Sequence, residues 1–434
     1  MEGLLVGIVG TYFMVCLILW GMPIAFSLLL VGLAGSLYLT GASATLPQLH
    51  LRLYNVVSTY SFTVVPFFIL MACFAGETGI TSELYTGAEK WVRRVRGGLC
   101  IATIVGCAFF AAISGSSVAT AALMSRVAFQ EMKKHNYDQG FAAGTIAAGG
   151  TIGFLIPPSV AFVVYGIITE VSVGKLLVSG VIPGIILTAI FSVSIFIIVK
   201  LNPKLAPNVL GPVSRKEKVI ALKNVWAVLV TFMVVIGGIY CGLFTPTEAG
   251  GVGAFTLFLI ALARRRLSLS KILNALDETM GATCMIFLIV YGAMLFGDFL
   301  ALSGVSTTLI SFIGELPISR YLILSMLVLL YFILGCLMES IAMFIITMPQ
   351  VLPLLLKLGF DPLWFGVIAV LLVQLGLLTP PVGLNVFVVA GITKIPASEI
   401  FRGSLIFWVG IIALIALLTA FPEIVLFLPQ MMAM

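Results

Sequence analysis

Charged residues are scarce in this sequence, and their scarcity excludes an ordinary soluble protein. Asp, Glu, Lys and Arg make up 9% of the 434 residues, whereas 61% of the residues are hydrophobic. Many apolar runs reach the roughly 17 to 20 residues that a helix needs to cross the hydrocarbon of a bilayer. A soluble core does not need runs of that length, so the composition predicts an all-α polytopic membrane protein.

Catalytic bases and nucleotide-binding loops are also missing. The two histidines, His50 and His135, lie in polar segments, and no lysine lies inside a predicted span. An intramembrane serine hydrolase needs a base beside its nucleophile, so this enzyme class is disfavoured. The sequence has no Walker A motif, so ATP is not the direct source of energy. We therefore predict that the chain is not an enzyme.

The seven cysteines support neither a disulfide framework nor a metal site. They lie in apolar segments, without a CxxC pair and without a nearby histidine. Packing as small apolar side chains is their expected role. No motif indicates an organic cofactor.

A short polar interruption, Ser114-Gly115-Ser116-Ser117, divides the apolar run from 97 to 127. Neither arm is long enough to cross the bilayer, and basic residues flank both ends of the run. These features favour a re-entrant hairpin with four non-helical residues at its tip, a structure tolerated at membrane depth only inside protein or along a cavity. One long spanning helix, kinked at the serines, is the alternative.

The same pattern returns 223 positions later. Four pairs share this shift: Ser117 with Ser340, Asp138 with Asp361, Pro157 with Pro380, and Pro158 with Pro381. A constant register across such different residue types indicates a tandem duplication into repeat 1 (1–200) and repeat 2 (223–434), joined by a polar cytoplasmic linker (201–222). Repeated helices interrupted by Gly and Pro point to the binding site of a secondary transporter.

Each repeat is predicted to contain five transmembrane helices and one hairpin. The parts of repeat 1 are scaffold helices within 1–76, an amphipathic interfacial arm at 82–96, the hairpin 97–127, a broken helix at 139–169 and a span at 176–200. The parts of repeat 2 are scaffold helices within 223–301, the hairpin 319–357, a broken helix at 362–393 and a last span at 404–428. An odd number of crossings inverts the second repeat relative to the first.

The basic residues agree with this inverted topology. Nineteen of the 23 Lys and Arg residues fall in loops that it places on one side, namely 77–99, 126–138, 200–224, 264–273 and 394–402. The positive-inside rule makes that side cytoplasmic, with both termini periplasmic. The net charge of +6 therefore reports topology and not a nucleic-acid partner. Residues 4–20 follow Glu2 and no basic segment, so we expect a retained first helix and not a signal peptide.

The hairpin tips and the broken helices form the candidate functional centre. Proline lacks an N–H and disfavours helix in the residue before it, so the helices at 139–169 and 362–393 should break in mid-membrane. A break frees carbonyl groups for a hard monovalent cation and exposes a helix N-terminus that favours an anion. Further oxygens come from Ser114, Ser116, Ser117, Ser340, Thr379 and Asn385. Proline kinks that serve packing alone are the alternative, and a passive channel is a rival function.

One acid stands apart from the other charged groups. Glu339 at the second hairpin tip needs water, a proton or a cation, unless its carboxylate only satisfies the hairpin backbone. Asp298 and Glu77 lie near span ends, where a solvated interfacial position is expected. Arg402 is interpreted as a topology anchor at a cytoplasmic boundary.

Four segments resemble signatures of the large membrane (M) subunit of TRAP (tripartite ATP-independent periplasmic) transporters. They are Ser114–Thr120, Ile156–Ser159, Gly242–Ala254 with its Phe-Thr-Pro-Thr-Glu-Ala core, and Thr379–Asn385. Because they are distributed along the chain, the resemblance covers its whole length. Glu339 departs from the pattern, where an aspartate is expected, although the carboxylate is kept.

The resemblance implies a sodium-driven importer in the inner membrane of a bacterium. Its substrate would be an organic acid, of the C4-dicarboxylate or sialic acid class, moved by an elevator motion. A periplasmic substrate-binding (P) protein would deliver the substrate, and a small membrane (Q) subunit would brace the scaffold as a separate chain within the phospholipid. A sodium- or proton-coupled carboxylate symporter without a binding protein is the second interpretation.

By motif position, the resemblance also implies two or more sodium ions. Sodium site 1 would comprise Ser114, Gly115, Ser116, Ser117, Gly153 and Pro157. Sodium site 2 would comprise Glu339, Ser340, Gly376, Thr379, Pro380 and Asn385. The substrate carboxylate would lie between the tips, near Ser116, Ser159, Thr379 and Asn385.

Overall fold

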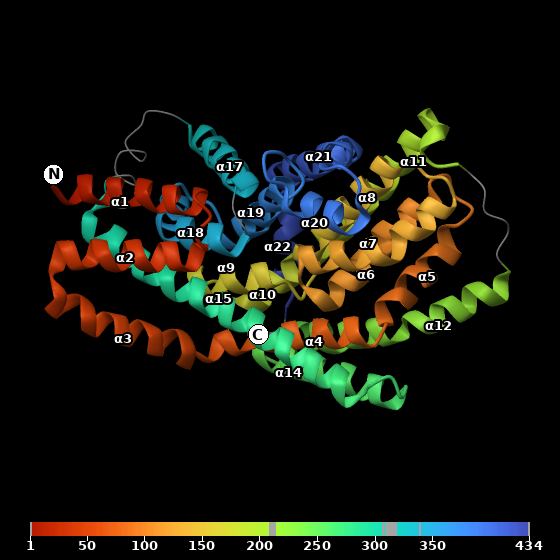
Figure 1. The fold of residues 1–434 in the computed structure, drawn as a ribbon, viewed down its shortest axis with the longest axis horizontal. Helices are drawn as coiled ribbons and strands as arrows, with labels where there is room; N and C mark the ends of the chain where they lie inside the picture. Colours follow the sequence, from red (N-terminus) through yellow and green to blue (C-terminus); the bar gives the residue numbers. More distant parts are fainter. Residues whose placement is uncertain (1, 208–213, 306–307, 309–318, 338–339, 433–434) are drawn as a thin grey trace.

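A computed structural model describes residues 2–207, 214–305, 308, 319–337, 340–432 of the chain (Figure 1). Within these residues the secondary structure is helical, without a strand, as the all-α prediction requires. The apolar composition and the length of the helices identify a polytopic helical membrane protein.

The repeat predicted from the sequence is visible in the element bounds. The first hairpin (hairpin 1) consists of α6 (Gly98–Ser114) and α7 (Ser117–Lys134), and the second (hairpin 2) contains α17 (Arg320–Leu337) and α18 (Ser340–Lys357). The broken helices are α8 (Gln139–Thr151) with α9 (Val160–Thr169), and α19 (Pro362–Gly376) with α20 (Leu384–Thr393). These bounds correspond, within one or two residues, at the offset of 223 read from the sequence.

The helices before each hairpin have no break of the kind that divides the helix after it. In repeat 1 they are α1 (Glu2–Leu19), α2 (Ile24–Thr40), α3 (Ala42–Ser58) and α4 (Val64–Glu77). In repeat 2 they are α12 (Arg215–Phe232), which continues through a π-helical turn at Met233–Gly237 into α13 (Gly238–Tyr240), then α14 (Pro246–Ala263) and α15 (Leu269–Ser303). The continuous helix α15 therefore stands where repeat 1 has α3, a short turn and α4.

Helix α3 was not predicted, because residues 42–58 contain no continuous apolar run. The segment alternates polar and apolar residues, includes Pro47 and carries His50 and Arg52. Its bidentate ion pair from Arg52 to Asp298, at 2.7 and 2.9 Å, holds it against α15. Asp298, expected as a solvated interfacial residue, is therefore a partner of α3.

Four predicted boundaries were wrong, each for a local reason. Hairpin 1 extends to Lys134 and not to 127, since α7 continues through its charged last turns. The linker is shorter than 201–222, because Ser214 and Glu217 form a capping box that starts α12. The last span ends at Ala420, where Pro422 interrupts it, and α22 (Glu423–Gln430) follows. The fourth, at the tip of hairpin 1, is described with the site.

Five stretches of the described chain are long and apolar enough to cross a membrane as continuous helices. They are Tyr60–Glu77, Val173–Leu201, Pro246–Ala263, Leu269–Ser303 and Ala397–Ala420. The stretch Val173–Leu201 comprises α10 (Val173–Ser179) and α11 (Val181–Leu201), and the last is α21. The other predicted crossings use shorter apolar helices, among them α2, α9 and both halves of the second broken helix.

The interfacial arm predicted at 82–96 is α5 (Ile80–Val92). Leu84 and Tyr85 are buried against α6 and α12, whereas Trp91 is half exposed, so the helix is amphipathic as expected. Glu83 binds Arg264 at 2.7 Å and Arg266 at 2.5 Å, which fixes the arm to the loop after α14.

The two repeats interlock by exchanging equivalent contacts. Helix α7 of hairpin 1 packs against α20 of repeat 2, and α18 of hairpin 2 packs against α9 of repeat 1. In the same way α2 packs on α15, and α14 packs on α4. The two hairpins approach the centre of the molecule from opposite sides (Figure 1). This exchange is the arrangement expected of two inverted copies, and it brings both hairpins next to both broken helices.

Candidate functional site

The tip of hairpin 1 is a two-residue turn. Helix α6 ends at Ser114, Gly115 has a left-handed φ of 60°, and Ser116 caps α7 by accepting a hydrogen bond from the Ala119 N–H at 3.3 Å. Glycine adopts this φ without strain, and serine is a favoured N-cap. The predicted four-residue irregular tip was therefore too long, because Ser114 and Ser117 belong to the helices.

Backbone groups of this tip touch the break between α8 and α9. The Val160 N–H donates to the Gly115 carbonyl at 3.3 Å. A Cβ atom on Gly115 would lie 2.5 Å from the Pro158 carbonyl oxygen, and one on Gly153 would lie 2.6 Å from the Ser116 carbonyl oxygen. Only glycine permits such an approach at either position. The predicted grouping of Ser114–Ser117 with the segment from Gly153 to Pro158 is therefore the grouping that the structure has.

Hydroxyl groups at the tip form a small buried network. Ser114 Oγ lies 3.1 Å from Thr120 Oγ1, which donates to the Ser116 carbonyl at 2.6 Å. Ser117 is fully buried at the start of α7. Thr120 was not among the predicted site residues, although its position one turn after Ser116 could have identified it. The tip thus presents a set of mostly buried oxygen atoms.

Ser159 was predicted to contact substrate, but its hydroxyl makes its hydrogen bonds within the break between α8 and α9. Its hydroxyl donates to the Phe154 carbonyl at 2.6 Å and accepts from the Phe162 N–H at 3.3 Å as the N-cap of α9. The side chain is fully buried. It holds the two halves of the broken helix together, and its contact with substrate remains a prediction.

The second break brings Thr379 to the first arm of hairpin 2. Thr379 Oγ1 lies 2.8 Å from Cys336 Sγ and 3.1 Å from the Leu375 carbonyl oxygen. The backbone of Gly376 is in direct contact with that of Gly335. Both breaks contain a cis peptide bond, Pro157–Pro158 and Pro380–Pro381. Two of the predicted ligands of sodium site 2 therefore lie together at this break.

The predicted tip of hairpin 2 includes residues beyond those that the structure describes. Glu339 lies outside the described residues, and of Ser340 the structure gives only its backbone, as the first residue of α18. The proposed carboxylate ligand of sodium site 2 therefore remains a prediction from the sequence.

Asn385 was predicted both for sodium site 2 and for the substrate group between the two tips, and the structure places its side chain against hairpin 1. Its Nδ2 donates to Ser117 Oγ at 2.8 Å and to the Ala147 carbonyl at 3.1 Å, so its amide binds hairpin 1 and α8 of repeat 1. The prediction had grouped it with Glu339 and Ser340 of its own repeat. The exchange of α7 against α20 explains the difference, because it carries the start of α20 to the opposite hairpin.

Two buried polar groups in this region lack a hydrogen-bond partner among the residues that the structure describes. Asn385 Oδ1 and both amide atoms of Gln374 are buried without a hydrogen bond in the described part of the chain. Buried polar atoms normally have partners, so ordered water or an ion is expected at these atoms. Gln374 was missed, although a glutamine inside the apolar helix α19 is a visible signal.

A cavity of about 430 Å³ lies against the tip of hairpin 1. Ser114, Gly115 and Ser116 form one wall, α4 and α15 form the opposite wall, and Ile341 of α18 also borders it. Both hairpins therefore contribute to a single space between the broken helices and the long helices.

Three charged side chains line the same cavity. They are Arg126 on α7, Glu77 at the end of α4 and Glu278 on α15. Arg126 was interpreted only as a residue flanking the hairpin, and Glu77 as an interfacial acid. Arg126 is exposed and has no ion pair within the residues that the structure describes. The cavity can therefore offer a cation to an anionic ligand beside the oxygen-lined tip.

Transition-metal chemistry has no support among the described residues, where no three His, Cys, Asp or Glu side chains come together. The available ligands are hydroxyl, amide and carbonyl oxygens. Such ligands suit hard cations and not the softer transition metals.

Comparison with known proteins places these features in a transporter family. The family model for the DctM component of tripartite ATP-independent periplasmic transporters matches residues 11–424. The chain is 35% identical to the C4-dicarboxylate TRAP transporter large permease protein DctM of Pseudomonas aeruginosa, covering 93% of this chain and 94% of that protein. It is 32% identical to the sialic acid TRAP transporter large permease protein SiaM of Vibrio cholerae, covering 95% of each.

Two further comparisons concern length and fold. The chain is 34% identical to the isethionate TRAP transporter permease protein DctMQ of Oleidesulfovibrio alaskensis, covering 96% of this chain but 65% of that longer protein. The structure is similar to that of the YdaH transporter of Alcanivorax borkumensis, with a TM-score of 0.58 and 15% identity over 86% of this chain and 88% of that one. The latter likeness concerns the fold alone.

Proposed function

Because this chain belongs to the family of DctM components of tripartite ATP-independent periplasmic transporters, we propose that it imports an organic acid by sodium-coupled secondary transport. The observation that carries the proposal is the contact between the tip of hairpin 1 and the first break. Glycines at 115 and 153 allow carbonyl and hydroxyl oxygens to converge there. A buried group of neutral oxygens inside a membrane protein suits a sodium ion.

The proposed substrate carries at least one carboxylate. The relatives are named for C4-dicarboxylates and for sialic acid, which share that group. The cavity beside hairpin 1 contains the exposed guanidinium of Arg126, and arginine binds carboxylates with two parallel hydrogen bonds. We place the substrate in this cavity, between Arg126 and the oxygen atoms of the tip.

The proposed mechanism is an elevator motion. The hairpins and broken helices pack closely on one another, while α4 and α15 line the other side of the cavity and touch them at α6, α9 and α18. This division supports a transport domain that moves as a unit against the long helices, carrying sodium and substrate together. Two sodium ions moving with a monoanion would carry one net positive charge inward, worth about 2.3 kcal/mol across 100 mV.

The proposed assembly lies in the bacterial inner membrane, with both termini periplasmic. A periplasmic binding protein delivers the substrate, and a small membrane subunit supports the scaffold as a separate chain. The names of the relatives from P. aeruginosa and V. cholerae, each a large permease protein, support a separate small subunit. The relative from O. alaskensis is a longer permease, of which this chain covers 65%. Experiment therefore has to show whether the small subunit of this transporter is a separate chain.

Uptake into proteoliposomes tests the proposal. The chain is reconstituted with its small subunit, its binding protein is added outside, and labelled succinate and N-acetylneuraminate are offered in parallel. We expect uptake of one acid that requires an inward sodium gradient. With two sodium ions, uptake of the monoanion N-acetylneuraminate should increase when the interior is made negative, whereas uptake of the succinate dianion should not. Equal uptake with potassium in place of sodium would contradict sodium coupling, and undiminished uptake without binding protein would favour the simpler symporter.

A further inference from the structure

A second cavity, of about 720 Å³, lies away from both hairpin tips. It is formed by the start of α8, the end of α11, the turn at Pro203–Leu205 and the first half of α21. None of the residues predicted to bind sodium or substrate lines it. The proposed transport mechanism does not involve this cavity.

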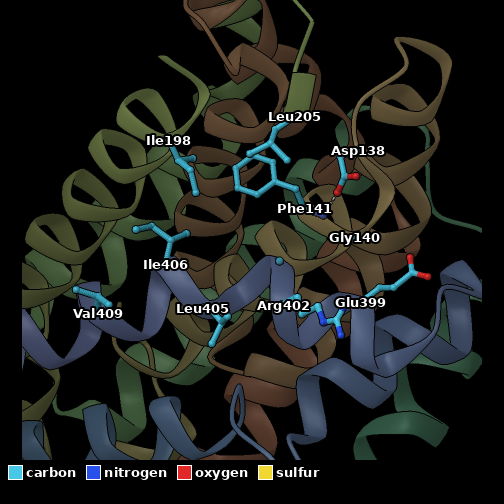
Figure 2. Close-up of a pocket in the computed structure, with 11 residues that line it drawn as sticks. Asp138, Gly140, Phe141, Ile198, Leu205, Glu399, Arg402, Leu405, Ile406 and Val409 are labelled. Atoms are coloured by element: carbon cyan, nitrogen blue, oxygen red, sulfur yellow. Dashed lines mark hydrogen bonds between the residues drawn. The ribbon is translucent and has the colours of Figure 1, made fainter. Parts of the chain in front are cut away.

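The wall of this cavity is divided into a polar end and an apolar end (Figure 2). Asp138, Glu399 and Arg402 gather at one end. Ile198, Ile406 and Val409 lie along the other end. A ligand that fills the cavity therefore needs a charged head and an apolar tail.

The charges at the polar end indicate the kind of head group. Arg402 and Glu399 are exposed, and neither has an ion pair within the described residues. Asp138 is partly committed, since its Oδ1 accepts from the Phe141 N–H at 2.8 Å as the N-cap of α8. A purely anionic head would meet two carboxylates beside one guanidinium. A head with both a phosphate and a primary ammonium can satisfy the guanidinium and a carboxylate together.

The position of the cavity suits a lipid and not a soluble ligand. Its apolar end lies between α11 and α21, which belong to the stretches long enough to span a membrane. Leu405 and Val409 on its rim are 49% and 62% exposed, as expected of side chains that face acyl chains. The loops at its polar end, 126–138, 200–224 and 394–402, are among those that the basic residues assign to the cytoplasmic side.

We propose that this cavity binds one phospholipid of the inner leaflet with a primary-ammonium head, such as phosphatidylethanolamine. The phosphate binds Arg402, the ammonium binds Glu399, and an acyl chain lies along Ile198, Ile406 and Val409. Helices α8 and α21 pack so closely here that the backbones of Gly140 and Gly403 are in contact. The lipid therefore covers the seam between a broken helix and the last long span.

Native mass spectrometry of the full-length protein tests this site. The protein is delipidated and titrated with phosphatidylethanolamine, phosphatidylcholine and phosphatidylglycerol of identical acyl chains. We expect one tightly held phosphatidylethanolamine, bound about tenfold more tightly than the other two, because choline cannot donate hydrogen bonds and glycerol carries no positive charge. Equal retention of the three lipids would overturn the proposal, and so would tightest binding of phosphatidylglycerol.

Three variants locate the bound lipid. Arg402→Gln and Glu399→Gln should each weaken phosphatidylethanolamine binding by about tenfold, the change expected for one lost charge-assisted hydrogen bond. Ile406→Trp should weaken binding of all three lipids by filling the apolar end. Lys394→Gln, in the same loop but outside the cavity, is the matched control and should bind like the wild type. Unchanged binding in properly folded Arg402→Gln and Glu399→Gln proteins would place the lipid elsewhere and contradict the assignment.

Discussion

Asn385 of repeat 2 holds Ser117 of repeat 1, with 2.8 Å between Nδ2 and Oγ. The serine begins the second arm of hairpin 1, and the asparagine lies at the start of the second half of the opposite broken helix. The hydrogen bond uses one lone pair of the Ser117 oxygen and leaves its proton and its second lone pair available to another partner. One repeat thus orients a candidate ligand of the other.

Replacing Asn385 with alanine should weaken sodium binding at the tip of hairpin 1. Asn385 is not part of that tip, but its amide orients Ser117 there. The variant loses the hydrogen bonds from the Asn385 amide to Ser117 and to the Ala147 carbonyl, both of which are buried. We expect the sodium concentration for half-maximal uptake to rise by about tenfold and the free energy of unfolding to fall by about 1–3 kcal/mol. Uptake against sodium concentration and thermal unfolding measure the two effects. Thr103→Val, which loses one buried hydrogen bond to the Leu99 carbonyl of its own helix, is the control.

The serine and threonine at the two breaks offer a direct test of the sodium sites. Ser117→Ala and Thr379→Val should each reduce the apparent sodium affinity while leaving the amount of protein inserted into the membrane unchanged. The reason is that each variant removes one candidate ligand oxygen and keeps the shape of the side chain. Sodium-dependent uptake in proteoliposomes with binding protein present checks the result. Thr188→Val on α11, where the lost bond is an ordinary one to the Gly184 carbonyl, is the matched control.

Wild-type sodium dependence in both Ser117→Ala and Thr379→Val would count against the two-site assignment. A change in only one of them would assign the sodium ion to that break alone. The two positions lie in different hairpin–break pairs, so their effects should combine independently if both sites exist.

The sequence predicts both breaks and the position of the first tip because a few residue types control the backbone there. Glycine at 115 supplies the left-handed turn, Ser116 and Ser159 supply N-caps, and the prolines end their helices. The proline pair recurs at the offset of 223, as does Ser117 at Ser340, so the repeat reinforces the inference of the two breaks. These features depend on neighbours in the chain and can be read without a structure.

Other features depend on contacts between distant segments and cannot be read in this way. Helix α3 is stabilised by packing on α2 and α15 and by the ion pair of Arg52, none of which the segment 42–58 reveals by itself. The contact of Asn385 with Ser117 requires the exchange of helices between repeats. Arg126 gains its place in the cavity only because α4 and α15 close the opposite wall.

Gly153 should not accept even the smallest side chain. A Cβ atom there would lie 2.6 Å from the Ser116 carbonyl oxygen and 2.9 Å from Thr120 Oγ1, which are both held by hydrogen bonds. Gly153→Ala should therefore push the hairpin tip away from the break, at a cost of about 1–3 kcal/mol in unfolding free energy. Sodium-dependent protection from thermal unfolding should be lost at the same time. Gly391→Ala, where a Cβ atom would meet nothing within 4 Å, should behave like the wild type.

The pair Arg52 and Asp298 should contribute modestly to stability, despite its bidentate geometry. The two side chains are 37% and 22% exposed, and solvent screens ion pairs of this kind. A double-mutant cycle with Arg52→Gln and Asp298→Asn should give a coupling free energy of about 1 kcal/mol or less. Denaturation in detergent at two salt concentrations measures it. A coupling free energy of several kcal/mol would contradict the expectation drawn from the solvent exposure of Arg52 and Asp298.

Arg126 should determine how tightly the transporter holds an anion during transfer. Its guanidinium faces the cavity that hairpin 1 borders, without an ion pair among the described residues, so it is available to a substrate carboxylate. Arg126→Gln should raise the KM for the transported acid by about tenfold, the loss expected for one charge-assisted contact, and Arg126→Lys should restore part of the affinity. Lys133→Gln, near the end of the same helix and outside the cavity, should leave KM unchanged. If Arg126→Gln instead alters only the sodium dependence, the arginine balances the charges of Glu77 and Glu278, and the substrate lies elsewhere in the cavity.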